Sequence, residues 1–175
     1  MTSPKMIPSN NDLYSKLDKI GLRAVSQNLD DFLARATTGR WPPHMLLEKL
    51  SAIEADDRSR RSLERRLSLS GIQRFKPMAD FDWNWPKKID RDVVERAFTL
   101  DFLKEARNLI MIGQNGLGKS MIAKNICHTA VLAGHSVLFR SASALIEDLQ
   151  CESPTARKRK LRTYGNAGLL CIDEV

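Results

Sequence analysis

The chain has 175 residues and a mass of 19.8 kDa, with 42% apolar and 28% charged residues and a formal net charge of +7. This composition excludes a largely disordered chain, and no stretch approaches the roughly 18 unbroken apolar residues that a membrane-spanning helix needs. The first residues lack the apolar core of a secretory signal, so we expect a cytoplasmic protein without membrane contact. The positive charge favours an anionic partner such as nucleic acid, although surplus lysine and arginine often form only a solvated surface.

The first part of the chain is predicted to be helical. Residues 1–11 are expected to form a loose tail, and apolar residues in 13–33 recur close to a 3.6-residue period. This period predicts one amphipathic helix, or two shorter ones broken near Gly21. A further helix is expected, with Pro42 and Pro43 in its first turn and a buried stripe that reaches Leu67, and its outer faces carry Arg58, Arg60, Arg61, Arg65 and Arg66. These arginines form either a solvated surface or a surface that contacts phosphates.

A segment without clear periodicity follows, between Ser68 and Asp90. It contains four aromatic residues, Phe75, Phe81, Trp83 and Trp85. We interpret it as a structured connector whose rings pack on the following domain, with stacking on nucleic-acid bases as the alternative. The predicted domains are therefore an all-α N-terminal module at residues 1–68 and an α/β domain at residues 69–175.

The remainder of the chain alternates between helical patterns and short apolar runs. We predict helices at residues 91–105, 118–133 and 144–149, and strands at 109–112, 136–140 and 169–172. Gly134 is expected to close the middle helix. Strands that alternate with helices predict a parallel sheet covered by helices. Cys127, Cys151 and Cys171 show no metal-binding spacing, and we interpret all three as reduced thiols.

The segment GQNGLGKS fits the pattern G-x-x-x-x-G-K-[ST] between a predicted strand and a predicted helix. Its glycines let the backbone wrap around a polyphosphate, and the helix N-terminus adds partial positive charge. Lys119 is expected to reach the β- and γ-phosphates of ATP and to assist catalysis, and Ser120 to bind Mg²⁺. A glycine-rich turn that carries Lys-Ser by chance is the alternative. The predicted nucleotide-binding residues are Gly113, Gln114, Asn115, Gly116, Leu117, Gly118, Lys119, Ser120 and Met121.

Two acids follow the last apolar run. A P-loop ATPase needs an acid at the end of a nearby strand to hold Mg²⁺, and Asp173 suits this role, usually through water. Glu174 suits the general base that orients the attacking water. A strand that ends in surface acids is common, but behind a phosphate loop the pair favours an ATPase site.

With these motifs, residues 42–175 resemble the IstB-type ATPases, helper proteins of insertion-sequence transposition in the AAA+ superfamily. GLLCIDEV is one of the segments on which the resemblance rests. The phosphate loop marks only the superclass, whereas ADFDW and the run from Ala133 to Phe139 point more narrowly to this family. The resemblance implies a P-loop AAA+ parallel sheet flanked by helices, ATP-dependent DNA binding and ATP hydrolysis. It also implies a partner transposase and a homo-oligomer.

The chain departs from the family pattern in two ways. Family loops commonly read GPPGVGKT, and the exchanges at Gln114, Asn115, Leu117 and Ser120 keep the phosphate chemistry. Family members continue past the acidic pair into a sensor strand, an arginine finger and a last strand. In the family strand order 5-1-4-3-2, strand 4 separates the phosphate-loop strand from the acidic strand. We therefore expect either direct pairing of these strands, with Asp173 displaced, or a gap with unpaired backbone groups. The chain is interpreted as an N-terminal fragment that is weak or inactive in ATP hydrolysis.

Other functions fit the same motifs. A DnaC-type replicative helicase loader would share every motif and differ only in its partner. A nucleotide-binding regulator or kinase would use the same loop on a small substrate. A non-functional remnant would fold poorly and have no activity. The basic stretch between the last two predicted strands is either a solvated helix or a DNA-contacting surface. Its cations are Arg157, Lys158, Arg159, Lys160 and Arg162.

Overall fold

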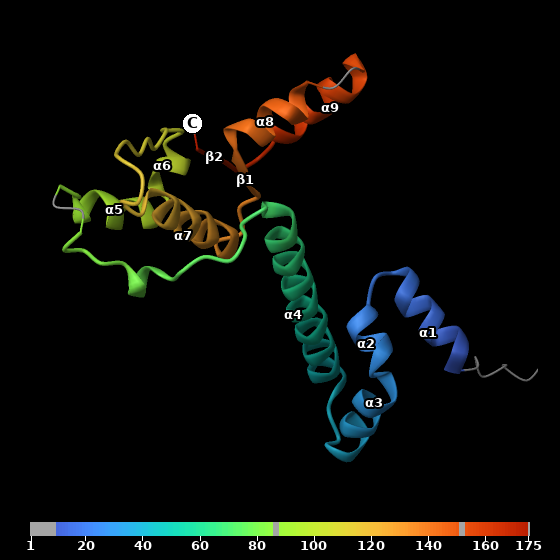
Figure 1. Cartoon of the computed structure of the whole chain (residues 1–175). Helices are drawn as coiled ribbons and strands as arrows, with labels where there is room; N and C mark the ends of the chain where they lie inside the picture. Colours follow the sequence, from blue (N-terminus) through green and yellow to red (C-terminus); the bar gives the residue numbers. More distant parts are fainter. Residues whose placement is uncertain (1–9, 86–87, 151–152, 175) are drawn as a thin grey trace, which may run out of the picture. The chain divides into compact units, whose positions relative to one another are not determined.

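The computed structural model describes residues 10–85, 88–150 and 153–174 (Figure 1). Residues 1–9 of the tail expected at 1–11 and the thiol of Cys151 lie outside these residues, whereas residues 10 and 11 are not tail but the start of a helix. The chain divides into two compact units, Met1–Ser62 and Leu63–Val175, and the division falls within the long helix α4 (Pro43–Ser70). None of the described helices is long and apolar enough to cross a membrane.

The described residues of the first unit form three short helices before α4. They are α1 (Asn10–Lys19), α2 (Arg23–Gln27) and α3 (Leu29–Thr38). The predicted break near Gly21 is confirmed, and a second break at Asn28 was not predicted. Their buried apolar residues are Val25, Leu29, Phe32 and Ala36. These residues form a small core, so the helices depend on packing rather than on length for stability.

A buried carboxylate links α2 to α4. Glu54 is 3% exposed and accepts a hydrogen bond from the backbone N–H of Ala24 at 3.0 Å. It also accepts bonds from Arg58 Nε at 3.4 Å and from Arg61 Nη2 at 3.2 Å. A buried charge needs partners of this kind, and Glu54 also satisfies an N–H in the first turn of α2.

The arginines of α4 are largely engaged within the chain. Arg60 and Arg61 both pair with Asp57, and Arg66 Nε donates to the carbonyl of Val131 at 3.2 Å. Arg65 is exposed. Because these side chains already have intramolecular partners, the structure favours a structural role for most of this arginine-rich face over contact with phosphates.

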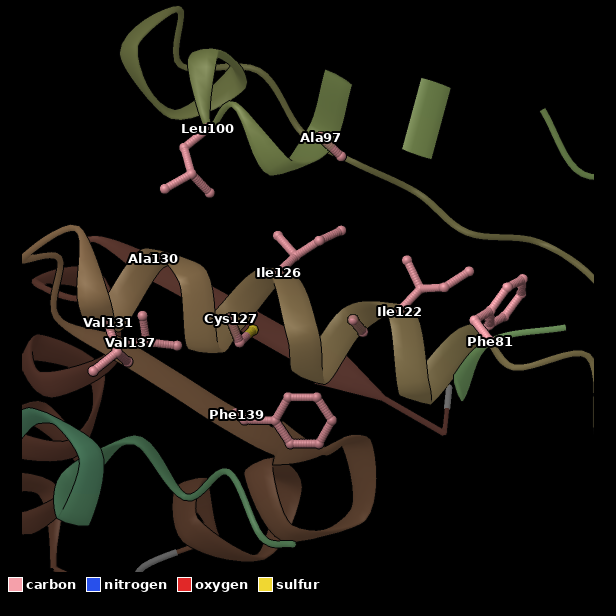
Figure 2. Close-up of a cluster of buried hydrophobic side chains, with 11 residues drawn as sticks. Phe81, Ala97, Leu100, Ile122, Ile126, Cys127, Ala130, Val131, Val137 and Phe139 are labelled. Carbon is pink, nitrogen blue, oxygen red and sulfur yellow. The ribbon is translucent and has the colours of Figure 1, made fainter. Parts of the chain in front are cut away.

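The core of the second unit is organised around α7 (Lys119–Leu132). Figure 2 shows α7 between two layers, with β1 on one side and the segment of Ala97 and Leu100 on the other. Ile122 and Ile126 point toward that segment, and Phe139 of β1 lies on the opposite side of the helix. The predicted helix at 91–105 is two helices, α5 (Arg91–Phe98) and α6 (Asp101–Lys104), separated at buried Leu100, whose φ is 61°.

The described sheet has two parallel strands, β1 (Val137–Ser141) and β2 (Leu169–Asp173). Their register pairs Val137 with Leu169 and Ser141 with Asp173. The helices α8 (Ala142–Leu149) and α9 (Pro154–Gly165) connect the two strands. This βααβ connection confirms the predicted parallel α/β arrangement.

The predicted strand at 109–112 is wrong. These residues have no assigned secondary structure, and Ile110 and Ile112 are 78% and 94% exposed. A strand exists only where a neighbour pairs with its backbone, and in the described residues the sheet contains β1 and β2 alone. Of the two arrangements expected for the acidic strand, direct pairing with 109–112 is therefore excluded, and Asp173 is not displaced by such pairing.

In its described residues, the connector after α4 forms a short 3-10 helix, η1 (Met78–Asp80). Phe81 is buried against α7, and the ring of Phe75 lies 5.4 Å from that of His128. Trp85, in contrast, is 60% exposed. The expected packing of the connector rings on the following domain thus holds for Phe75, Phe81 and the half-buried Trp83 but not for Trp85.

Two cysteine thiols meet in the core. Cys127 of α7 is buried, and its contact with the Cys171 thiol of β2, followed by burial, raises the pKa of Cys127 above its usual value. Both are free cysteines, as predicted. Their role is packing between the helix and the strand.

An acid on α8 fastens α9. Asp148 accepts hydrogen bonds from Lys160 Nζ at 2.6 Å and from the hydroxyl of Tyr164, and these bonds hold the pKa of Asp148 below its usual value. The stabilisation is therefore present above the unfolded pKa of about 3.9 and is lost as the pH falls through the folded pKa.

We expect Asp148→Asn to lower the free energy of unfolding at pH 7 by about 1 kcal/mol or less, because the pair is partly exposed. Near pH 3 the variant and the wild type should differ less, since the carboxylate is then largely protonated in the unfolded state and part of its stabilisation of the fold is lost. Urea unfolding at the two pH values measures the difference. An equal loss of stability at both pH values would contradict the assigned role of the carboxylate charge.

Candidate nucleotide-binding site

The predicted phosphate loop lies directly before α7. Gly116 and Gly118 have φ angles of 82° and 84°, a region that residues with a Cβ rarely adopt. Gly118 is the N-cap of α7, so the first N–H groups of the helix open toward the loop. A cavity of about 310 Å³ is lined by Asn115, Gly116, Gly118, Lys119, Ser120 and Met121. The structure thus brings six of the nine predicted nucleotide-binding residues to one cavity at a helix N-terminus.

The Lys119 side chain forms hydrogen bonds with the backbone of the loop. Its Nζ donates to the carbonyl of Gly113 at 2.7 Å and to that of Gln114 at 2.8 Å. The ammonium group therefore lies over the turn formed by the glycines, close to the helix N-terminus. Both features attract an anion, and a phosphate group in the loop would take over the hydrogen bonds that Nζ now gives to the two carbonyls.

Ser120 connects the loop to the acidic strand. Its hydroxyl donates to Asp173 Oδ1 at 3.1 Å, so the first turn of α7 meets the end of β2. This pair supplies hard oxygen ligands, which Mg²⁺ prefers together with substrate phosphates. The residues fit a magnesium ion bound with a nucleotide, and in the described part of the chain no cluster of three metal-binding side chains forms a site without one.

Glu174 is placed differently from the other predicted residues. It has a φ of 57° and lines a separate cavity of about 650 Å³, which Asp173 also borders. Neither acid lines the loop cavity, but Asp173 is joined to it by the hydrogen bond from Ser120. The structure therefore brings Asp173 to the phosphate loop, whereas the role of Glu174 as general base stays a prediction.

Two residues that support the loop and its helix were not predicted as part of the site. The ring of Phe81 lies against Gly118, and the amide of Asn125 joins α7 to the connector. The sequence contained a signal for Phe81, because ADFDW is one of the runs that carry the family resemblance. Nothing in the sequence marked Asn125.

Taken together, a parallel α/β unit, a glycine-rich loop before a helix and an acid beside its serine define a P-loop nucleotide-binding protein. Residues 15–175 match the family described as IstB-like ATP binding protein. The chain belongs to this family, as the resemblance in the sequence implied.

Individual relatives agree with this assignment. The chain is 28% identical over 166 residues to a protein of Pseudomonas aeruginosa named as a candidate ATP-binding protein of insertion sequence IS21. It is 24% identical over 168 residues to the corresponding protein of insertion sequence IS232 from Bacillus thuringiensis subsp. berliner. It is 26% identical over 130 residues to that of IS5376 from Geobacillus stearothermophilus.

These matches cover 94%, 95% and 74% of this chain but only 63%, 67% and 52% of the respective relatives. The chain thus spans about two thirds or less of the length of these relatives.

Proposed function

We propose that the chain is an ATP-binding helper protein of insertion-sequence transposition, which binds DNA when ATP is bound and stimulates a partner transposase. The observation that carries the nucleotide part is the contact between Ser120 and Asp173. A hydroxyl and a carboxylate, both oxygen groups of the kind that Mg²⁺ prefers, thus lie beside the loop that would hold the phosphates. The names of the relatives, all proteins of insertion sequences, favour a transposition helper over a replicative helicase loader.

The DNA part of the proposal rests on α9. This helix contains no acidic residue, and Lys158, Arg159 and Arg162 are exposed on it. Residues spaced by three and four positions share one face of a helix, so these cations form a continuous patch. Lys160 differs, because it pairs with Asp148. Exposed cations in such a patch attract the phosphate backbone without regard to base sequence.

The experiment measures binding of duplex DNA by fluorescence anisotropy at several salt concentrations, with and without Mg-ATP. We expect ATP to tighten binding by the wild type. The triple variant Lys158→Ala, Arg159→Ala, Arg162→Ala should bind more weakly, and its plot of log affinity against log salt should flatten by about 2 to 3, because each phosphate contact contributes about 0.9.

A matched control removes three cations that already pair with acids elsewhere in the chain. Lys16, Arg60 and Lys104 are exposed to a comparable degree, and each forms an ion pair. Their triple alanine variant loses the same net charge and should keep the wild-type slope. An equal change of slope in both variants would show that the effect comes from net charge and not from α9. An unchanged slope in the α9 variant would show that α9 is a solvated helix without DNA contact.

A further inference from the structure

The connector contacts the phosphate loop at its most constrained residue. Phe81 is 8% exposed, and a Cβ added to Gly118 would lie 2.6 Å from Phe81 Cε2 and 3.4 Å from Phe81 Cδ2. The ring therefore fills the space that a side chain at this position would occupy. Figure 2 shows Phe81 at the end of α7 where Ile122 lies. The face of Gly118 on which a Cβ would project is thus covered by an aromatic ring.

A second contact fixes the connector two turns further along the same helix. Asn125 is 9% exposed, and its Nδ2 donates to the carbonyl of Lys76 at 2.9 Å and to that of Met121 at 2.8 Å. Its Oδ1 accepts the backbone N–H of Met78 at 3.1 Å. Buried amide groups with several partners hold both partners in one geometry. The connector is therefore tied to α7 on the approach to Phe81.

The ring of Phe81 also packs against a second aromatic ring of the connector. Trp83 packs on it edge to face, with ring centroids 4.9 Å apart, and the guanidinium of Arg91 lies 4.8 Å from the Trp83 ring. Edge-to-face pairs and cations over aromatic faces both stabilise one ring orientation. Arg91 is the first residue of α5, so this stack joins the connector to the next helix.

We infer that Phe81 is a positioning residue for nucleotide phosphates, acting through Gly118. This inference rests on the proposed nucleotide binding. Phe81 does not line the loop cavity, so it acts by limiting the motion of the glycine whose conformation opens the helix N-terminus. A glycine-rich loop loses much conformational entropy when it closes around a ligand. A ring that already restricts Gly118 reduces that loss, which strengthens binding by preorganisation.

The experiment measures Mg-ATP and Mg-ADP affinity by titration calorimetry for Phe81→Leu and Phe81→Ala. Leucine keeps the site apolar and serves as the variant expected to stay folded. We expect affinity to fall by about 3-fold for leucine and about 10-fold for alanine, as preorganisation is lost in steps. The matched control is Val131→Ala, since Val131 is fully buried at the opposite end of α7. It should lower the melting temperature without changing nucleotide affinity.

A double-mutant cycle distinguishes positioning from general packing. Gly118→Ala brings a Cβ against the ring of Phe81, so it should weaken nucleotide binding strongly in the wild type. In the Phe81→Leu background the obstruction is smaller, so the same substitution should weaken binding at least about 3-fold less. The ring restricts Gly118 only if the effects of Phe81→Leu and Gly118→Ala on nucleotide affinity are coupled.

The outcomes separate this inference from the proposed function. Absence of any heat with the wild type would overturn nucleotide binding and, with it, the role of Phe81. Normal binding by the wild type with equal affinity in Phe81→Leu, or additive effects of Phe81→Leu and Gly118→Ala, would overturn only the positioning role.

Discussion

Replacing Lys119 by alanine is expected to reduce ATP affinity by about 100-fold, which corresponds to about 3 kcal/mol of lost charge-assisted hydrogen bonding. The reason is the placement of Nζ, which reaches the carbonyls of Gly113 and Gln114 and so lies over the mouth of the loop. In that position it neutralises phosphate charge at the same place where the helix N-terminus offers its N–H groups. Titration calorimetry with Mg-ATP measures the loss.

The matched control is Lys124→Ala. This lysine is on the same helix, but its Nζ lies 5.5 Å from the centre of the Phe139 ring, and it does not line the loop cavity. It should bind ATP with nearly wild-type affinity. The Lys119 variant should keep the wild-type melting temperature within a few degrees, because its hydrogen bonds are exposed and contribute little to stability. Equal ATP affinity in the two variants would show that Lys119 and its loop do not bind the nucleotide.

The phosphate loop was predictable because its requirements are local. Positive φ angles at Gly116 and Gly118 and a helix that begins at Lys119 follow from a short run of residues. The same holds for the end of α7, where Gly134 has a φ of 97° and the N–H of His135 reaches the carbonyl of Ala130 at 2.9 Å. Features that depend on neighbours in the chain were therefore found from the sequence.

Features that depend on distant partners were found only in part. The strands predicted at 136–140 and 169–172 pair with each other, but the equally apolar run at 109–112 has no strand partner in the described residues and stays irregular. Strand propensity measures how well side chains suit a paired sheet and does not create the pairing. The contact between Phe81 and Gly118 was missed for the same reason, because the spacing of residues along the chain does not reveal which ring covers which glycine.

The arginines of α4 show a further limit of sequence patterns. As a run of cations they suggested a surface for phosphates, whereas Arg58 and Arg61 bind a buried carboxylate at Glu54. Acids and arginines that are three, four or seven positions apart lie on one face of a helix. Such charges pair within the helix and are then less available to phosphates. The exposed cations of α9 lack acids on their own helix, and for this reason they make the better candidate for DNA contact.

Replacing Asp173 by asparagine should change the dependence of ATP binding on Mg²⁺ rather than binding as a whole. The amide oxygen can still accept the hydrogen bond from Ser120, so the local structure is kept while one negative charge is removed. With Mg²⁺ present, affinity should fall by about 10-fold, or about 1.4 kcal/mol, because the metal loses an ionised oxygen ligand.

Without Mg²⁺ the sign of the effect is expected to reverse. The carboxylate of Asp173 then repels the phosphates, and its removal relieves an unfavourable interaction on the order of 1 kcal/mol, so Asp173→Asn should bind ATP in EDTA at least as tightly as the wild type. Glu174→Gln is the matched control, because it removes the same charge from the next residue, whereas the contact with Ser120 belongs to Asp173. It should keep the wild-type ratio of the two affinities. If both variants changed this ratio equally, the effect would reflect net charge, and the contact between Ser120 and Asp173 would not mark the metal site. A selective change in Asp173→Asn alone follows only from a carboxylate that faces both the metal and the phosphates.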